Sequence, residues 1–143
     1  MRYIFILFLM IFCLFGDTTF AEPKPSFENP RQIIFAITED SPHELDHVLS
    51  VANNVLKFYG IDNVEIEIVA YSQGISLLLK KEKEIAKRVD SLMQNNVTFV
   101  ACHNTMVTKN IKEDDLIDGS LVVTAGVVEL LERVKSGWIY IKP

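Results

Sequence analysis

The sequence has only two cysteines among its 143 residues, and this scarcity restricts its covalent chemistry. Cys13 lies in an apolar N-terminal segment that we expect to be cleaved, so the mature protein would retain Cys102 alone. One cysteine excludes an internal disulfide. In an oxidising compartment an unpaired thiol is open to oxidation unless it is buried or has a chemical role. A small apolar core residue is the simplest alternative for Cys102.

Motifs that hold nucleotides are missing, and the evidence for a metal site is weak. Neither G-x-G-x-x-G nor G-x-x-x-x-G-K-[ST] occurs, so no phosphate-binding loop is indicated. His43 and His47 are four residues apart, which suits a pair of metal ligands, but no clear third ligand accompanies them. We therefore interpret both histidines as solvated helix residues and expect neither a metal nor a cofactor.

The sequence also lacks an excess of positive charge. It has 14 Lys and Arg against 19 Asp and Glu, a formal net charge of −5 that removal of the N-terminal segment leaves unchanged. This balance argues against nucleic acid and anionic membrane surfaces as partners, because both favour a basic face. Beyond residue 21, no stretch is long and apolar enough to span a membrane.

The N-terminal segment, residues 1–21, resembles a cleavable signal peptide. Arg2 precedes an apolar run over residues 3–15, and a polar patch then ends in Thr-Phe-Ala21, a typical cleavage site. The run is shorter than the ~20 residues of a membrane-spanning helix, so a single membrane anchor is the less favoured alternative. We therefore expect a periplasmic or secreted protein that begins at Glu22.

Removal of residues 1–21 from the 143-residue chain leaves 122 residues, enough for one domain. Residues 22–30 contain three prolines and are expected to form an extended N-terminal arm before a domain over residues 31–143. Within that domain, short apolar runs alternate with amphipathic segments. We expect strands at 33–37, 64–70, 97–101, 121–124 and 138–141, and helices at 43–59, 75–79, 85–93, 105–110 and 127–134.

This alternation predicts an α/β fold in three layers, with a mainly parallel five-stranded sheet flanked by helices. Residues 64–68 alternate apolar and acidic side chains, which suggests that the second strand lies toward the outside of the sheet. Glu129 and Arg133 are four residues apart on the last helix, and we interpret them as an ordinary surface ion pair.

The third strand carries the candidate site. Residues 97–101 form a continuous apolar run of the kind that is buried on both faces, and Cys102 follows it directly. The carboxyl ends of strands are where ligands bind in open α/β sheets. A helix that begins after Cys102 would favour its thiolate. A protease-type pair of Cys102 with His103 is disfavoured, because no carboxylate partner is recognisable and adjacent residues often point to opposite sides.

The chain resembles the DsrE/DsrF-like family, which includes the subunits of sulfur relays. The residues that carry this resemblance are V-T-F-V-A-C-H-N-T-M at 97–106, Asn110-Ile111, V-V-T-A-G-V-V-E-L at 122–130 and G-W-I-Y-I-K-P at 137–143. The resemblance implies a flavodoxin-like or Rossmann-like sheet and assembly into trimers or hexamers. It also implies a persulfide carried on Cys102, which matches the position of the family's cysteine.

Two main functional hypotheses follow, and a redox sensor is a third, less favoured one. In the first, Cys102 is a periplasmic sulfur carrier or transferase that exchanges sulfur with a donor or acceptor protein. Asn104 and Thr105 would then assist as hydrogen-bond donors or caps, and His103 would act as a proton donor. In the second, the protein is a non-enzymatic oligomeric module that binds a small molecule or a protein, and Cys102 is a buried structural residue. Exposure and reactivity of Cys102 distinguish the two.

Overall fold

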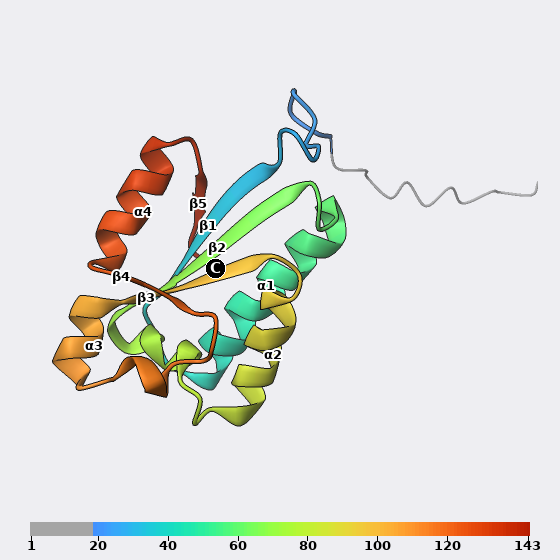
Figure 1. Cartoon of the computed structure of the whole chain (residues 1–143). Coiled ribbons are helices and arrows are strands. Elements are labelled where there is room, and N and C mark those ends of the chain that lie inside the picture. Colours follow the sequence, from blue (N-terminus) through green and yellow to red (C-terminus); the bar gives the residue numbers. More distant parts are fainter. Residues whose placement is uncertain (1–18) are drawn as a thin grey trace, which may run out of the picture.

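Five parallel strands form one sheet in the order β4-β3-β2-β1-β5, as the computed structural model of residues 19–143 shows (Figure 1). Residues 1–18, which include most of the expected signal peptide and Cys13, lie outside the described part of the chain. The strands are β1 (Arg31–Ile37), β2 (Val64–Ala70), β3 (Val97–Cys102), β4 (Leu121–Val123) and β5 (Ile139–Ile141). The α/β class and the parallel pairing are confirmed, and the pairing holds at every strand contact in this sheet.

The helices occupy the expected connections. They are α1 (Pro42–Tyr59), η1 (Ser72–Leu78, a 3-10 helix), α2 (Lys83–Met93), α3 (His103–Lys109), η2 (Glu113–Asp115, also 3-10) and α4 (Gly126–Lys135). Ser41 caps the start of α1, since its side chain accepts a hydrogen bond from the Glu44 N–H at 3.2 Å. Gly60 ends this helix with a positive φ of 83°.

A close approach of backbone explains why the connection after β2 forms a tight 3-10 helix. A Cβ on Gly74 would lie 2.2 Å from the carbonyl oxygen of Ile37, at the end of β1. Only glycine fits at this distance, so Gly74 lets η1 pack against the carboxyl edge of the sheet. The packed η1 buries Ile75, Leu77 and Leu78 in the main core.

The two faces of the sheet are covered unequally. The main hydrophobic core lies on the side of α1, α2 and η1, and α3 also contributes Met106 to it. The connection from β4 to β5 runs back across the sheet, and a right-handed crossover in that direction places α4 on the opposite face. There a small second core joins Ile34, Val69 and Val100 to side chains that include Leu130 and Trp138.

The position expected for the second strand is wrong. β2 is the central strand, with β1 and β3 on its two sides. Of its two acidic residues, only Glu65 is exposed, whereas the Glu67 side chain is buried with 1% exposure. The alternating pattern misleads because an arginine from α4 pairs with Glu67, which allows a carboxylate to lie inside the fold.

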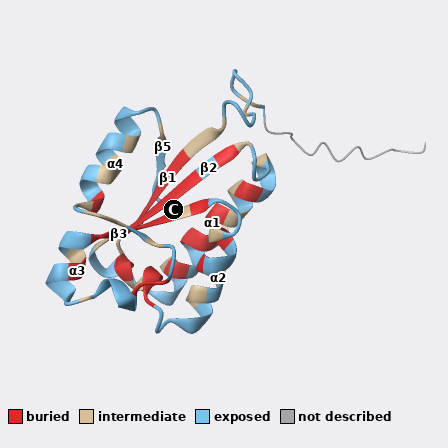
Figure 2. Cartoon of the chain, viewed as in Figure 1, coloured by how far each residue is buried: buried red, intermediate tan, exposed pale blue. Residues whose placement is uncertain are grey.

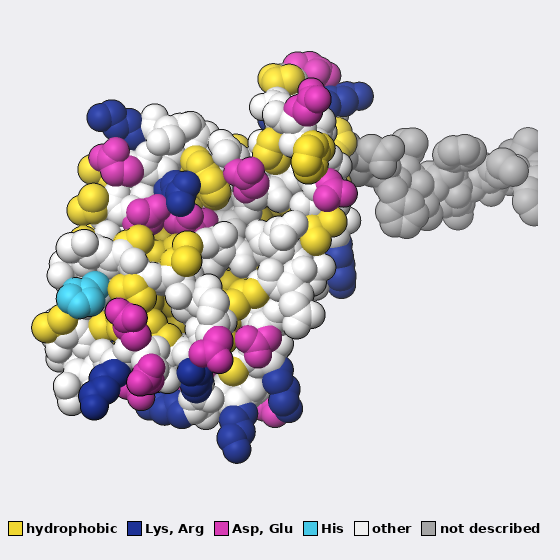
Figure 3. Space-filling model, in the orientation of Figure 1, with side chains coloured by type: hydrophobic (Ala, Val, Ile, Leu, Met, Phe, Trp, Pro, Cys, Tyr) yellow, Lys and Arg dark blue, Asp and Glu magenta, His cyan; other side chains and the backbone are white. Residues whose placement is uncertain are grey.

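Helix α4 and strand β5 remain largely exposed although both are rich in apolar residues (Figure 2). The exposed side chains on these two elements are Val127, Val128, Leu131, Val134, Ile139, Tyr140 and Ile141, with exposed fractions between 38% and 62%. We call this set the α4–β5 surface. Hydrophobic side chains line the outer side of α4 in the space-filling view (Figure 3).

The expected N-terminal arm forms a small turn in which Ser26 and Asn29 pair through their backbones. Phe20 stacks on Phe58 of α1, with ring centroids 5.5 Å apart. Within residues 19–143, no helix is both long enough and apolar enough to cross a membrane.

Candidate functional site

Cys102 is the last residue of β3 and the residue that precedes helix α3. Helix α3 packs toward the main core, whereas α4, which follows the neighbouring strand β4, lies on the opposite face. Adjacent strands whose connections diverge in this way leave a crevice at their carboxyl ends, and ligands of open α/β proteins bind in such crevices. Cys102 therefore occupies the position in this sheet where a ligand site is most expected. Its residual exposure is 6%.

The surroundings of the thiol favour its ionised form. Burial raises the pKa of Cys102, but hydrogen bonds from the Thr105 hydroxyl and from the backbone N–H groups of Gly126, Thr105 and Asn104 outweigh it. The net result is a pKa below the ordinary value of a cysteine thiol. A cysteine in a purely apolar core would show the reverse, because nothing there offsets the loss of hydration. The thiol is thus buried, and yet its hydrogen-bond donors favour the thiolate.

Thr105 holds its hydroxyl in position through a second contact. Its Oγ1 accepts a hydrogen bond from the Ser72 N–H at 3.1 Å, which leaves the hydroxyl hydrogen free to point to the Cys102 sulfur. Ser72 has a positive φ of 54° at the start of η1. The left-handed turn after β2 therefore helps to orient the donor for a cysteine on β3.

Gly126 brings the first residue of α4 against the thiol. A Cβ built on Gly126 would lie 3.0 Å from Val69 Cγ1 and 3.4 Å from the Cβ atoms of Cys102 and Tyr71. The absence of a side chain is what permits this contact. The sequence analysis did not place Gly126 at the site, although its position between a strand and a helix was a usable signal.

The other residues expected at the site take different positions. Thr105 contacts the thiol, whereas His103 is exposed at the first position of α3. The Asn104 side chain is also exposed, and its backbone N–H donates to the Thr124 carbonyl at 3.2 Å. Asn104 therefore ties α3 to the end of β4. The structure brings Cys102 and Thr105 together and leaves His103 and the Asn104 side chain at the surface.

An open cavity of about 590 Å³ lies beside the thiol. Its lining residues are Tyr71, Ser72, Gln73, Asn104, Thr105, Thr108 and Lys109. Lys109 provides a positive charge in this lining, and its ammonium group donates to the Gln73 side chain. Thr105 both lines the cavity and contacts the sulfur, so the cavity adjoins the candidate site. Sequence reasoning did not identify Gln73 and Lys109, which lie on η1 and α3.

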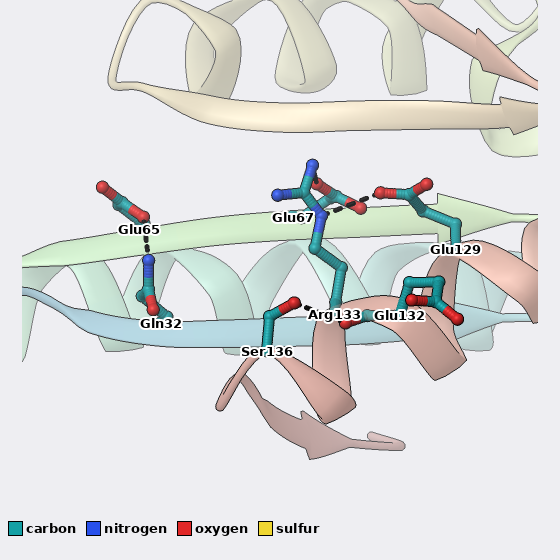
Figure 4. A network of polar contacts seen from close by, with 7 residues as sticks. All are labelled: Gln32, Glu65, Glu67, Glu129, Glu132, Arg133 and Ser136. Carbon is teal, nitrogen blue, oxygen red and sulfur yellow. Dashed lines mark hydrogen bonds and ion pairs between the residues drawn. The ribbon is translucent and has the colours of Figure 1, made fainter.

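A cluster of charged side chains lies between α4 and the sheet, on the face that carries the small second core (Figure 4). Arg133 contacts Glu67 and Glu129, with nitrogen–oxygen distances of 2.8 Å to each carboxylate. The ion pair expected between Glu129 and Arg133 is present, but it is not an ordinary surface pair, because Arg133 also neutralises a buried carboxylate. Sequence spacing shows neighbours on one helix but not a partner on a strand.

The pKa of Glu67 and an unpartnered oxygen of its carboxyl group also indicate an unusual environment. Burial raises its pKa from 4.5 to about 7, the negative charge and hydrogen bond of Glu129 add to this, and Arg133 partly offsets it. The Oε1 atom of Glu67 is buried and has no donor among the described residues. A proton shared between the Glu67 and Glu129 carboxyl groups would satisfy it.

The histidines of α1 lie apart from these groups. The rings of His43 and His47 stack with centroids 5.8 Å apart, and the His43 side chain is 81% exposed. Among residues 19–143, no three His, Cys, Asp or Glu side chains gather closely enough to hold a metal ion.

Comparisons with known proteins agree with the fold. MTH1491, a protein of unknown function from Methanobacterium thermoautotrophicum, is 34% identical, with a TM-score of 0.74 over 79% of this chain and 99% of its own. The ychN protein from E. coli is 19% identical, with a TM-score of 0.68 over 79% of this chain and 99% of its own. BT1422, a conserved protein of unknown function from Bacteroides thetaiotaomicron, is 15% identical, with a TM-score of 0.58 over 78% and 93%.

A search of curated protein sequences finds no match. The profile of the DsrE/DsrF-like family matches residues 32–143, which include every strand except the first residue of β1, together with Cys102 and the residues around it. The chain therefore belongs to the DsrE/DsrF-like family, which is associated in general with sulfur relay.

Proposed function

We propose that the protein is an exported sulfur carrier that holds sulfane sulfur on Cys102 as a persulfide and passes it to an acceptor thiol. The observation that carries this proposal is the set of hydrogen bonds from Thr105 and Gly126 that lowers the pKa of a buried thiol. A structural core cysteine has no need of such donors. A sulfur carrier does, because the thiolate is the nucleophile in sulfur exchange.

The chemistry is an exchange that requires no external oxidant. The Cys102 thiolate attacks the outer sulfur of a donor persulfide, polysulfide or thiosulfate, and a new S–S bond forms at Sγ. The S–S bond of the donor breaks, and its electron pair leaves with the donor thiolate or sulfite. An acceptor thiolate then attacks the outer sulfur of the Cys102 persulfide, and the electron pair of the breaking bond returns to Sγ.

The site residues have unequal parts in this proposal. Thr105 and the Gly126 N–H stabilise negative charge on the sulfur, both before attack and when the thiolate is the leaving group. Asn104 contributes by fixing the start of α3 to Thr124 and by lining the adjoining cavity. His103, which is exposed at the first position of α3, is proposed as a proton donor to the departing thiolate of the donor.

The proposal includes self-assembly through the α4–β5 surface. Soluble monomers seldom expose a contiguous apolar patch of this kind, and a second copy of the chain is the occupant that the family resemblance implies. Export rests on the pattern of residues 1–21. N-terminal sequencing of the protein from its producing cell should find Glu22 first, and a chain that retains Met1 would contradict export by cleavage.

The second candidate function is an oligomeric binding module in which Cys102 is structural. The 6% exposure of Cys102 favours it, because a donor must reach a nearly buried sulfur. In this alternative, the donors around the sulfur serve only to satisfy a polar atom inside the fold.

Mass spectrometry separates the two candidates. The chain with Cys13→Ser, in which Cys102 is the only thiol, is incubated with thiosulfate or polysulfide and compared with the same chain carrying Cys102→Ser. Sulfur transfer predicts a gain of one sulfur mass that the reductant dithiothreitol removes and that the Cys102→Ser chain lacks. No adduct, together with slow alkylation of native Cys102, would support the structural role.

A further inference from the structure

The charged cluster under α4 and the thiol site share one helix. Gly126, the first residue of α4, donates to the Cys102 sulfur, and Glu129 and Arg133 on the next turns hold the same helix to Glu67 of β2. At about 1.5 Å per residue, Gly126 and Arg133 are only about 10 Å apart along the helix. The contacts of Arg133 and the donor that lowers the thiol pKa thus belong to one short helix.

Helix α4 lies over β1, β2, β3 and β5, but little of it is buried against them. Gly126 is its only buried residue, and Leu130 supplies its contact with the small second core. The ion pair from Arg133 to Glu67 adds a polar attachment to the central strand, and Arg133 also stacks 4.9 Å above the Trp138 ring. This imbalance makes the charge state of the cluster important for the position of α4.

The cluster is neutral only when it holds one proton. Two carboxylates and one guanidinium carry a net charge of −1, and a shared proton between Glu67 and Glu129 brings the charge to zero. That proton would also give the buried, unpartnered Oε1 of Glu67 a hydrogen-bond partner. Deprotonation leaves an uncompensated charge beneath the helix, which is unfavourable in a buried site.

The neighbours of Glu67 on the adjacent strands cannot neutralise the cluster in place of this proton. Across the sheet, its neighbours are Ile34 on β1 and Thr98 on β3, and neither is ionisable. Other titratable groups in this region are Glu65 and Glu132 (Figure 4), Tyr71 at the small second core and Tyr140, which pairs with Ile34. Among the charged groups of residues 19–143, Arg133 and Glu129 are those that shift the pKa of Glu67, and Glu65 instead accepts a hydrogen bond from Gln32 at 2.7 Å.

We propose that Glu67, Glu129 and Arg133 position the thiol: one shared proton clamps α4 to the sheet and keeps the Gly126 N–H on the Cys102 sulfur. Loss of the proton loosens the clamp and weakens the stabilisation of the thiolate. Glu67 thus acts through α4 and does not touch the reacting sulfur, since Thr98 beside it lies four residues, about 13 Å, before Cys102 along β3. The proposal deepens the proposed function, because it concerns the reactivity of Cys102.

The test is the rate of alkylation of Cys102 by iodoacetamide as a function of pH, in the full chain with Cys13→Ser. The parent chain should show a thiolate titration with a second inflection near pH 7, where the cluster loses its proton. Glu67→Gln keeps the cluster neutral at every pH, so its profile should be a single titration with a thiol pKa lower by about one unit. Glu65→Gln is the matched control on the same strand and face, and it should reproduce the parent profile.

Arg133→Lys provides a second variant, because lysine keeps the charge but cannot bridge two carboxylates in the same way. It should raise the thiol pKa relative to the parent, and circular dichroism verifies that each variant is folded. Identical profiles for the parent and Glu67→Gln would overturn the proposal, as would an equal effect of Glu65→Gln. In the parent chain, a lowered thiol pKa without an inflection near pH 7 would contradict the clamp alone, whereas failure of the parent chain to load sulfur would contradict the carrier function.

Discussion

The backbone N–H of Gly126 faces the sulfur of Cys102, and a methyl group on Gly126 would lie 3.4 Å from the Cys102 Cβ. A residue of α4 thereby lowers the pKa of a thiol on β3. The two residues meet only because β3 and β4 are adjacent in the sheet. This contact makes the reactivity of Cys102 sensitive to changes on a helix that begins more than twenty residues later in the sequence.

Gly126→Ala should push the start of α4 away from Val69, Cys102 and Tyr71. Because the added methyl meets close neighbours, the thiol pKa should rise by about one unit and stability should fall by about 1–3 kcal/mol. Iodoacetamide alkylation against pH and urea unfolding measure the two effects. Glu132→Ala, on the exposed side of the same helix, is the control, and an unchanged thiol pKa in Gly126→Ala would show that this N–H is unimportant.

Thr105→Val removes the hydroxyl donor while it keeps the shape of the side chain. The pKa of Cys102 should rise by about one unit, because the thiolate loses a hydrogen bond. Sulfur loading at neutral pH should slow in proportion. Thr108→Val serves as the control, since its hydroxyl bonds to the Asn104 carbonyl at 2.9 Å on the same helix. Equal effects of both substitutions would argue against a specific role for Thr105.

Stability should depend on pH through Glu67. The pKa of its carboxyl is raised from 4.5 to about 7 by folding, so the folded state binds a proton that the unfolded state releases in this range. Its contribution is fully present below pH ~4.5 and is lost as the pH rises to about 7, an effect of about 3 kcal/mol.

The measurement compares the free energy of unfolding of the parent chain and Glu67→Gln at pH 5 and pH 8. Glutamine stays neutral at both pH values. The free energy of unfolding of Glu67→Gln should therefore increase by about 3 kcal/mol relative to that of the parent from pH 5 to pH 8. Glu65→Gln should follow the parent throughout. Parallel pH profiles for the parent and Glu67→Gln would mean that the buried carboxyl does not titrate in this range.

Leu131→Glu should disrupt assembly through the α4–β5 surface. Leu131 is 62% exposed at the centre of this surface, and a carboxylate there would lose hydration in an interface. Light scattering should give a larger particle for the parent chain and a smaller one for the variant. Phe27→Glu, at an apolar residue with 78% exposure in the N-terminal arm, is the control. A parent chain that is monomeric would contradict the assembly.

Local patterns in the sequence were sufficient for the order and type of most elements. The 3–4 residue spacing of Leu45, Val48, Leu49 and Ala52, with Ser41 before it and Gly60 after it, indicated α1 because helix periodicity and caps are local properties. The continuous apolar run of β3 likewise indicated a strand buried on both faces. The position of Cys102 at the carboxyl end of that strand followed directly.

The tertiary structure alone decided what surrounds that thiol and which charges are buried. Glu67 looked like a solvated residue of an outer strand, and Glu129 with Arg133 looked like a surface pair. Strand order placed β2 in the centre of the sheet and α4 above it, so one arginine from α4 joined both carboxylates. Hydrogen bonds and burial between distant segments depend on how elements pack, whereas sequence spacing records only neighbours along the chain.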